Sequence, residues 1–237
     1  MPKFAANLTM LFTEVPSLDR PGLAAQAGFD GVEILFPYDH PVKDWQAALA
    51  GMPLALINTP PGDWVSGDRG FAAVPGQEAQ FRDSFLRGAD LANRLGAARL
   101  HVMAGVAKGP QAEQVFVENL AWAAAQAPDQ RLVIEPLNPD DMPGYFLNDF
   151  DQAARIIDDL GIDRLGIQFD LWHAARIHGD ADAVWARHQG RVNHIQIAGF
   201  PGRNDLPAYK VKYENGVLAV EFSERGELQP ALVGRRR

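Results

Sequence analysis

The chain of 237 residues contains no cysteine. Disulfides, thiolate metal sites and cysteine nucleophiles are therefore excluded together, and any bound metal must take oxygen or nitrogen ligands. Long apolar runs are missing too, since no stretch approaches the roughly 20 residues of a membrane span. The N-terminal MPKFAANLTM also lacks the apolar core of a signal peptide. We expect a cytoplasmic protein that does not enter membranes.

Positive charge is the scarcer sign: 22 Lys and Arg stand against 30 Asp and Glu, which gives a formal net charge of −8. Nucleic-acid binding normally requires a clustered basic face. The one dense basic run, 235–237, is a short stretch that we interpret as solvated. We therefore expect no nucleic-acid partner. Small molecules are the expected partners, and a homo-oligomer is possible.

Short runs rich in Val, Ile and Leu alternate along the chain with helix-like segments. This repetition predicts parallel strands joined by helical crossovers, and at this length it favours one (β/α)₈ TIM-like barrel domain over 1–237. The predicted strands are Phe4–Leu8, Gly31–Phe36, Leu54–Asn58, Ala98–Met103, Leu132–Pro136, Leu165–Asp170 and Val192–Ile197, and the clearest helices are Gln80–Leu95, Gln111–Ala127 and Phe150–Leu160.

The pattern breaks after Gly199. Asn215-Gly216 is a strong two-residue hairpin signal between two strand-like runs, so we predict a hairpin over 209–222 where a helix belongs. The stretch 225–237 is too short and too broken by Gly and Pro for a closing helix. The last βα unit of the barrel is therefore expected to be abnormal.

Oxygen-bearing side chains end three of the predicted strands. Glu135 lies in LVIEPLNP, Asp170 in LGIQFDLWHAA and Gln196 in VNHIQIAGF. The carboxyl ends of barrel strands share one face, where catalytic groups of such barrels lie. Two carboxylates and an amide there predict a site for a hard divalent cation, Mg²⁺ or Mn²⁺. The alternative is that these acids cap helices or lie solvated in loops.

Three further side chains are candidates for substrate binding. His173 lies about one helical turn beyond Asp170, where it either donates a hydrogen bond to a substrate oxygen or caps the helix. Arg203 lies in a Gly- and Pro-rich loop, where it either binds a substrate carboxylate through two parallel hydrogen bonds or is solvated. His101, in LHVMAG, points into the barrel mouth or belongs to the core.

The loop 59–78 is long for a connection between a strand and a helix, and it carries Trp64, Arg69 and Phe71. On the expected active-site face it would form a lid or a wall. The alternative is a surface loop that packs its own aromatic side chains.

Several stretches resemble the hydroxypyruvate isomerase family, within the wider sugar-isomerase and tagatose-epimerase-like barrels. The resemblance covers about residues 2–204 and is carried by FAANLTMLFTEVP, AGFDGVEILFPYD, LINTPPGDW, LHVMAGV, LVIEPLNP, FDLWHAA and HIQIAGFPGR. It implies a TIM-like barrel and an isomerisation between hydroxypyruvate and tartronate semialdehyde (2-hydroxy-3-oxopropanoate). A relative in that family acts on 2-oxo-tetronate, which is the alternative substrate.

The resemblance also implies roles for single residues. Glu135 resembles a catalytic acid/base and metal ligand, and Asp170 and Gln196 resemble further ligands, while His173 and Arg203 resemble substrate contacts. Glu221, in LAVEFSERG, is the best match to the family's second catalytic and metal-binding glutamate. However, the separation between Gln196 and Glu221 is shorter than in the family pattern by about the length of one helix. The competing interpretation of Glu221 is an exposed acid on an edge hairpin.

This chemistry moves a carbonyl between adjacent carbons through an enediolate. A carboxylate serves as general base, and a divalent cation stabilises the oxyanion. Three rival hypotheses remain open: a non-catalytic ligand-binding barrel, a phosphodiesterase that the acidic charge disfavours, and a truncated barrel that folds poorly.

Overall fold

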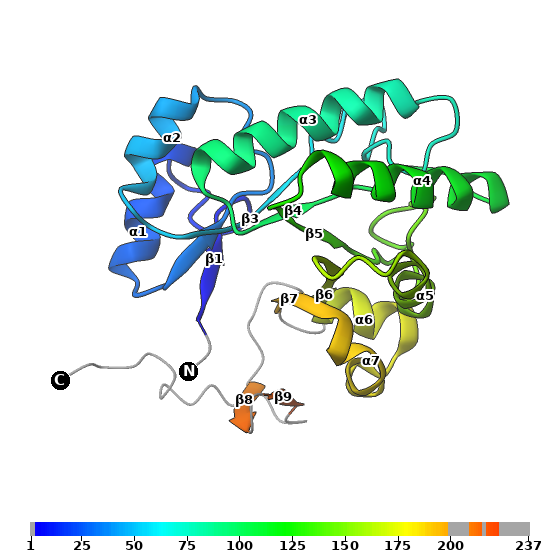
Figure 1. Cartoon of the computed structure of the whole chain (residues 1–237). Coiled ribbons are helices and arrows are strands. Elements are labelled where there is room, and N and C mark those ends of the chain that lie inside the picture. The colour runs from blue at the N-terminus through cyan, green and yellow to red at the C-terminus, as the bar shows by residue number, and fades with distance from the viewer. Residues whose placement is uncertain (1–2, 199–208, 215–216, 223–237) are drawn as a thin grey trace.

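Seven parallel strands form a curled sheet in a computed structural model that describes residues 3–198, 209–214 and 217–222. The strands pair in chain order, and the helices lie on the outside of the sheet (Figure 1). The strands are β1 (Ala5–Asn7), β2 (Gly31–Glu33), β3 (Leu54–Asn58), β4 (Arg99–His101), β5 (Arg131–Ile134), β6 (Leu165–Asp170) and β7 (Val192–Gln196). Each crossover returns beside the preceding strand, which confirms the predicted TIM-like barrel class.

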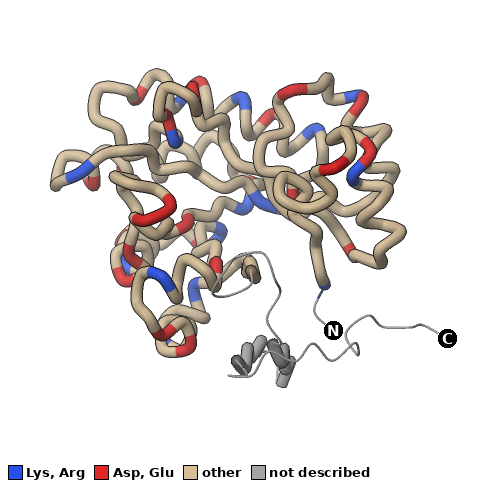
Figure 2. The backbone as a smooth tube through the Cα atoms, turned by 180° about the vertical axis from the view of Figure 1, so that it is seen from behind, with Lys and Arg blue, Asp and Glu red and all other residues tan. Residues whose placement is uncertain are grey.

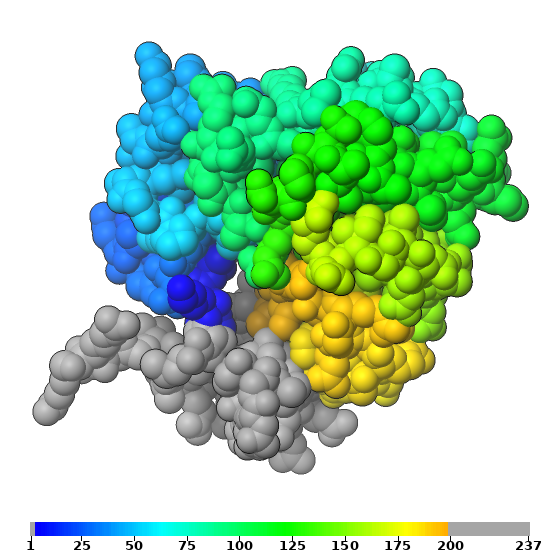
Figure 3. Space-filling view, in the orientation of Figure 1, coloured from blue at the N-terminus to red at the C-terminus, as the bar shows by residue number. Residues whose placement is uncertain are grey.

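The helices occupy the crossovers between these strands. They are α1 (Arg20–Gln26), α2 (Val42–Leu49), α3 (Glu78–Leu95), α4 (Pro110–Gln126), α5 (Phe150–Leu160), α6 (Leu171–His178) and α7 (Ala181–His188), with short 3₁₀ turns η1 (Ser17–Asp19) and η2 (Gln189–Arg191). Figure 3 shows the colours following one another around the molecule from blue to orange. Consecutive βα units are therefore neighbours in space, as parallel winding requires.

Local sequence signals fix the ends of α5, whose predicted bounds coincide with the observed ones. The Asp149 side chain accepts a hydrogen bond from the Gln152 backbone N–H at 2.7 Å and so caps the first turn. Gly161 ends the helix with φ +58°, a left-handed conformation that favours glycine. The buried Phe150 ring packs 5.1 Å from that of Phe169, which holds α5 against β6.

All six residues of β6 are buried, as expected for a strand covered on both faces. Side chains alternate along a strand, so Phe169 points towards the helices while its neighbours Gln168 and Asp170 point the other way. Phe169 indeed contacts Phe150 of α5 and Trp185 of α7. The interior of the curled sheet therefore receives the polar side chains of this strand.

The predicted hairpin is present. Strands β8 (Tyr209–Glu214) and β9 (Val217–Phe222) pair antiparallel, with Glu214 opposite Val217, so two residues connect them. They form a two-stranded sheet of their own, and among the described residues no eighth strand joins the parallel sheet. The last unit thus departs from the barrel pattern, as predicted.

Among the described residues, no helix is long and apolar enough to cross a membrane. Figure 2 shows acidic and basic positions interspersed along the described backbone. Such mixing of both signs is typical of a solvated protein surface.

The long loop between β3 and α3 has two parts. Its inner part is tied to the segment after β4, because Ala73 donates its backbone N–H to the Ala104 carbonyl at 2.6 Å and Gly70 forms a bridge with Ala104. In its outer part the Arg69 guanidinium lies 3.7 Å from the centre of the Trp64 ring. The loop is therefore a fixed wall at its base and packs its own aromatic residue further out; a lid movement stays a prediction.

Two glycines of this loop allow a matched test. A Cβ on Gly70 would lie 2.4 Å from the Cβ and the carbonyl oxygen of Met103, whereas a Cβ on Gly67 would meet nothing within 4 Å. Both have similar positive φ angles, +98° and +102°, so alanine strains both backbones alike. We expect Gly70→Ala to lower the free energy of unfolding by about 1 to 3 kcal/mol more than Gly67→Ala in urea titrations. Equal losses would contradict a fixed loop base.

Candidate active site

Polar side chains from adjoining strands meet at the carboxyl ends of β4 to β7. His101 ends β4, Glu135 follows β5, and Asp170 and Gln196 end β6 and β7. Asp170 and Gln196 are register partners, so the parallel ladder itself brings their side chains to one level. His101, Glu135 and Asp170 are buried, and Gln196 is partly buried. The predicted convergence of Glu135, Asp170 and Gln196 on one end of the sheet is present.

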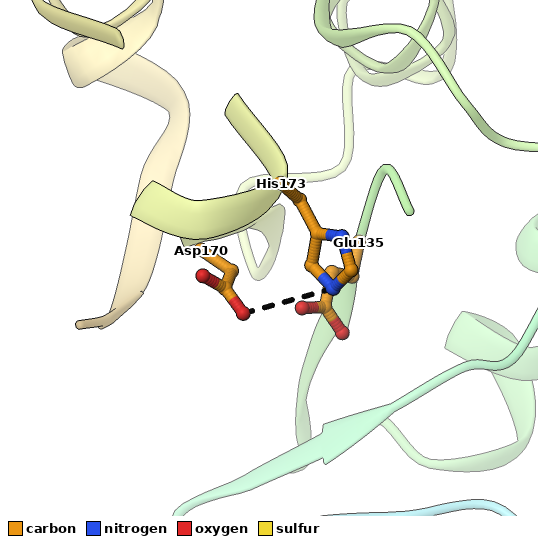
Figure 4. Close-up of side chains that lie close together, drawn as sticks. All are labelled: Glu135, Asp170 and His173. Atoms are coloured by element: carbon orange, nitrogen blue, oxygen red, sulfur yellow. Dashed lines mark ion pairs between the residues drawn. The ribbon is translucent and has the colours of Figure 1, made fainter. Parts of the chain in front are cut away.

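The core of the site is a cluster of Glu135, Asp170 and His173, which are 6%, 3% and 3% exposed. One polar atom from each lies within 4.8 Å of the others. Figure 4 shows the three side chains pointing toward one another from the end of β5 and the start of α6. The dashed contact joins His173 Nε2 and Asp170 Oδ2 at 3.7 Å.

Asp170 has two functions in this geometry. Its Oδ1 accepts the Trp172 backbone N–H at 2.8 Å and caps α6, while its Oδ2 faces His173. The cap interpretation considered for Asp170 is therefore correct, and it coexists with a place in the cluster. The cap interpretation considered for His173 is wrong, because Asp170 is the capping residue of α6.

The side-chain amides of Gln168 and Gln196 connect the cluster to β2, across the inside of the curled sheet. Gln168 Nε2 donates to Glu135 Oε2 at 2.8 Å and to Gln196 Oε1 at 2.9 Å. Gln196 Nε2 in turn donates to Glu33 Oε2 at 2.7 Å. Carboxylates only accept, so the acids at the two ends fix the orientation of both amides. The carbonyl oxygen of Gln196 is thereby turned away from Glu33 and towards Gln168.

Glu33 is a second buried acid, at the end of β2, and 4% exposed. It accepts hydrogen bonds from Asn7 Nδ2 at 3.2 Å and from Gln196, and it contacts His194 Nε2. Strands β2 and β7 are not ladder neighbours, so these contacts cross the inside of the curled sheet. Glu33 and Asn7 therefore face the interior of the curled sheet.

His101 is 1% exposed, and its Nδ1 lies 3.7 Å from Glu135 Oε2. Burial, followed by the nearby His173, lowers the pKa of His101 to about 3. The ring is therefore neutral at physiological pH, and its approach to Glu135 is not an ion pair. In the described part of the chain neither ring nitrogen has a hydrogen-bond partner.

The donor set fits a hard divalent cation. Two carboxylates of like charge, each more than nine-tenths buried, lie beside an amide oxygen whose orientation is fixed. Oxygen ligands of this kind suit Mg²⁺ and Mn²⁺. A cation also offsets the repulsion that two neighbouring carboxylates experience away from water.

Two predicted site residues, Arg203 and Glu221, stay predictions. Arg203 is outside the described residues. Glu221 lies in β9 opposite Lys210, in the two-stranded sheet and not in the parallel one. The structure does not describe the Glu221 side chain, so the role of Glu221 stays a prediction.

Sequence reasoning missed three contributors: Gln168, Asn138 and His194. Gln168 precedes Asp170 by two residues in a strand, and this alternation was a usable signal that it shares the same face. Asn138 is fully buried in the loop after β5 and bonds to His173. Nothing in its local sequence indicates that partner.

Comparisons with known proteins show the family of this chain. The xylose isomerase-like TIM barrel family matches residues 21–215. A 2-oxo-tetronate isomerase of Cupriavidus necator is 42% identical over 221 residues, covering 90% of this chain and 85% of the relative. A hydroxypyruvate isomerase of Escherichia coli K12 is 38% identical over 232 residues, covering 94% and 90%.

A solved structure from Brucella melitensis, described as an AP endonuclease of family 2, superimposes with a TM-score of 0.81 at 39% identity, covering 85% of this chain and 81% of that one. The family model, the relatives and the fold therefore agree. The chain belongs to the hydroxypyruvate isomerase and 2-oxo-tetronate isomerase family of xylose isomerase-like TIM barrels, and it is an isomerase.

Proposed function

We propose that the protein interconverts hydroxypyruvate and 2-hydroxy-3-oxopropanoate (tartronate semialdehyde) by proton transfer. The observation that carries this proposal is the buried convergence of Glu135 after β5, Asp170 at the end of β6 and His173 in the first turn of α6. The E. coli relative is named for hydroxypyruvate isomerisation. The neutral, buried His101 beside Glu135 adds a polar group for a small polar substrate.

The reaction removes a proton from C3 of hydroxypyruvate and returns one to C2, while the hydroxyl proton passes from the oxygen on C3 to the oxygen on C2. The carbonyl thereby moves from C2 to C3 through an enediolate. No oxidant or reductant is consumed. Glu135 is one carboxylate for this proton transfer, and its bond from Gln168 holds it in a fixed orientation. Glu221 is proposed as the other, and the order in which the two act is left open.

Glu135, Asp170, Gln196 and Glu221 would hold a divalent cation, Mg²⁺ or Mn²⁺, all through oxygen. When bound, the cation supplies Lewis-acid stabilisation of the negative charge that develops on the substrate oxygens.

Three residues are proposed to bind the substrate. His173 donates a hydrogen bond to a substrate oxygen, and Arg203 binds the substrate carboxylate through its planar fork of donors, which a lysine would not reproduce. His101 is a third polar contact from β4. Together these groups would select a short acid with adjacent oxo and hydroxyl groups.

A second substrate, 2-oxo-tetronate, is favoured by the C. necator relative, which carries that name at 42% identity. The same transposition between C2 and C3 applies to this longer acid. Values of kcat/KM for the two acids, measured side by side, decide between them, since the ratio reports differential transition-state binding.

Glu135→Gln removes the proposed base while keeping a side chain of the same size. We expect turnover to fall by at least about 100-fold, because general-base catalysis contributes roughly 10² to 10⁴. Proton NMR in D₂O follows both the conversion of hydroxypyruvate and the entry of deuterium into the product. Glu118→Gln, at an exposed position of α4, is the control and should retain full activity. Full activity of the Glu135 variant would overturn the proposal.

Glu221→Gln tests the second carboxylate. If Glu221 takes part in proton transfer, turnover is lost while the melting temperature stays within the range of the Glu118→Gln control. An active Glu221→Gln enzyme would instead identify Glu221 as a hairpin acid outside the site.

Asp170→Asn tests cation binding without removing the helix cap, because Asn caps helices as well as Asp does. We expect the affinity for Mn²⁺ to fall by at least about tenfold, since ligand charge sets the affinity of oxygen sites. Bound metal is first removed from the protein with a chelator. Electron paramagnetic resonance of unbound Mn²⁺ then measures the affinity. Asp180→Asn is a matched control, because Asp180 caps α7 through the Ala183 N–H at 2.9 Å. Equal affinities in both variants would exclude Asp170 as a ligand.

A further inference from the structure

Asn138 contacts His173 through two different donors. It lies in the loop after β5 and is 0% exposed. Its backbone N–H donates to His173 Nδ1 at 3.0 Å, and its side-chain Nδ2 lies 2.8 Å from the same ring nitrogen. A backbone N–H can only donate, so Nδ1 must be the acceptor.

Asp141 fixes the orientation of the Asn138 amide. Its Oδ2 lies 3.0 Å from Asn138 Nδ2, and a carboxylate only accepts, so this atom of the amide is the nitrogen. The other end agrees, because Asn138 Oδ1 accepts the Asp141 backbone N–H at 3.0 Å. Asp141 Oδ2 also accepts from Trp172 Nε1 at 2.8 Å, which ties the loop to the first turn of α6.

We propose that Asn138 is a positioning residue that holds His173 as the neutral tautomer with its hydrogen on Nε2. The inference deepens the proposed function and rests on it for the role of His173 towards substrate. With Nδ1 occupied as acceptor, the hydrogen of the neutral ring belongs on Nε2, the atom that lies 3.7 Å from Asp170 Oδ2.

The tautomer of His173 decides which members of the cluster can bind a cation. The geometry of Glu135, Asp170 and His173 would allow all three to bind one cation. A ring nitrogen that carries hydrogen cannot ligate a metal. His173 is therefore a hydrogen-bond donor to a substrate oxygen, and cation binding falls to the oxygen ligands.

The direct test is a long-range ¹H–¹⁵N correlation spectrum of protein labelled with ¹⁵N-histidine, recorded at pH 8 before and after addition of Mg²⁺. The His173 signals are identified by their absence from the spectrum of His173→Gln. We expect a protonated Nε2 and an unprotonated Nδ1 in both states. A hydrogen on Nδ1, or loss of the Nε2 hydrogen when Mg²⁺ is added, would overturn the inference.

Asn138→Asp replaces the side-chain donor with an acceptor at nearly constant volume. The introduced carboxylate competes with the retained backbone N–H at Nδ1, so we expect the fraction of His173 rings with a hydrogen on Nδ1 to rise. We expect kcat to fall by about 10- to 100-fold, the usual effect of losing a residue that orients a catalytic group. Asn148→Asp, at an exposed position of the same loop, should change neither. An unchanged His173 spectrum in a folded Asn138→Asp protein would count against the positioning role.

Asn138→Ala covers the case in which the aspartate variant does not fold. It keeps the backbone donor, so the Nε2 hydrogen should persist, while kcat falls because one of the two contacts that orient the ring is lost. The spectrum is independent of turnover: the expected tautomer in a protein that converts neither acid would support the inference and refute the proposed function. The opposite tautomer in an active enzyme would refute the inference alone.

Discussion

Burying two carboxylates side by side is the constraint on which the site depends. Glu135 and Asp170 lie at neighbouring strand ends, where they are poorly hydrated and repel each other. The fold offsets part of this cost with N–H donors, from Gln168 to Glu135 and from the Trp172 backbone to Asp170. The N-terminus of α6 also favours negative charge at its cap. A divalent cation bound here would complete the compensation, which would link metal binding to the stability of the site.

The inside of the curled sheet is held together by polar contacts as well as apolar ones. TIM barrels usually fill this space with layers of branched apolar side chains. Here Glu33 connects to β7 through Gln196 and His194, and Arg99 Nε donates to the Asn193 carbonyl at 2.7 Å. In the described sheet β7 has one ladder neighbour, β6. These contacts with β2 and β4 therefore help to hold β7, the strand that carries Gln196, in place.

The apolar runs of the sequence predicted burial better than they predicted pairing. The bounds of β3, β6 and α5 coincide with the prediction, but β4 ends at His101 although the predicted strand ran to Met103. Val102 and Met103 are buried in the segment that packs against the β3–α3 loop. An apolar side chain is selected for burial whether or not its backbone joins a ladder, so composition alone overextends strands.

The sequence by itself determined that oxygen-bearing side chains follow three apolar runs, and hence that Glu135, Asp170 and Gln196 lie at one end of a parallel sheet. The hairpin was equally local, because Asn215-Gly216 encodes its turn within two residues. The tertiary structure alone decided the partners: Asn138 bonds His173 across 35 positions, and Gln196 bonds Glu33 across 163. Hydrogen-bond donors and acceptors are too common in any sequence to identify such pairs. Only the folded chain brings two of them to within 3.0 Å of each other at buried or partly buried positions.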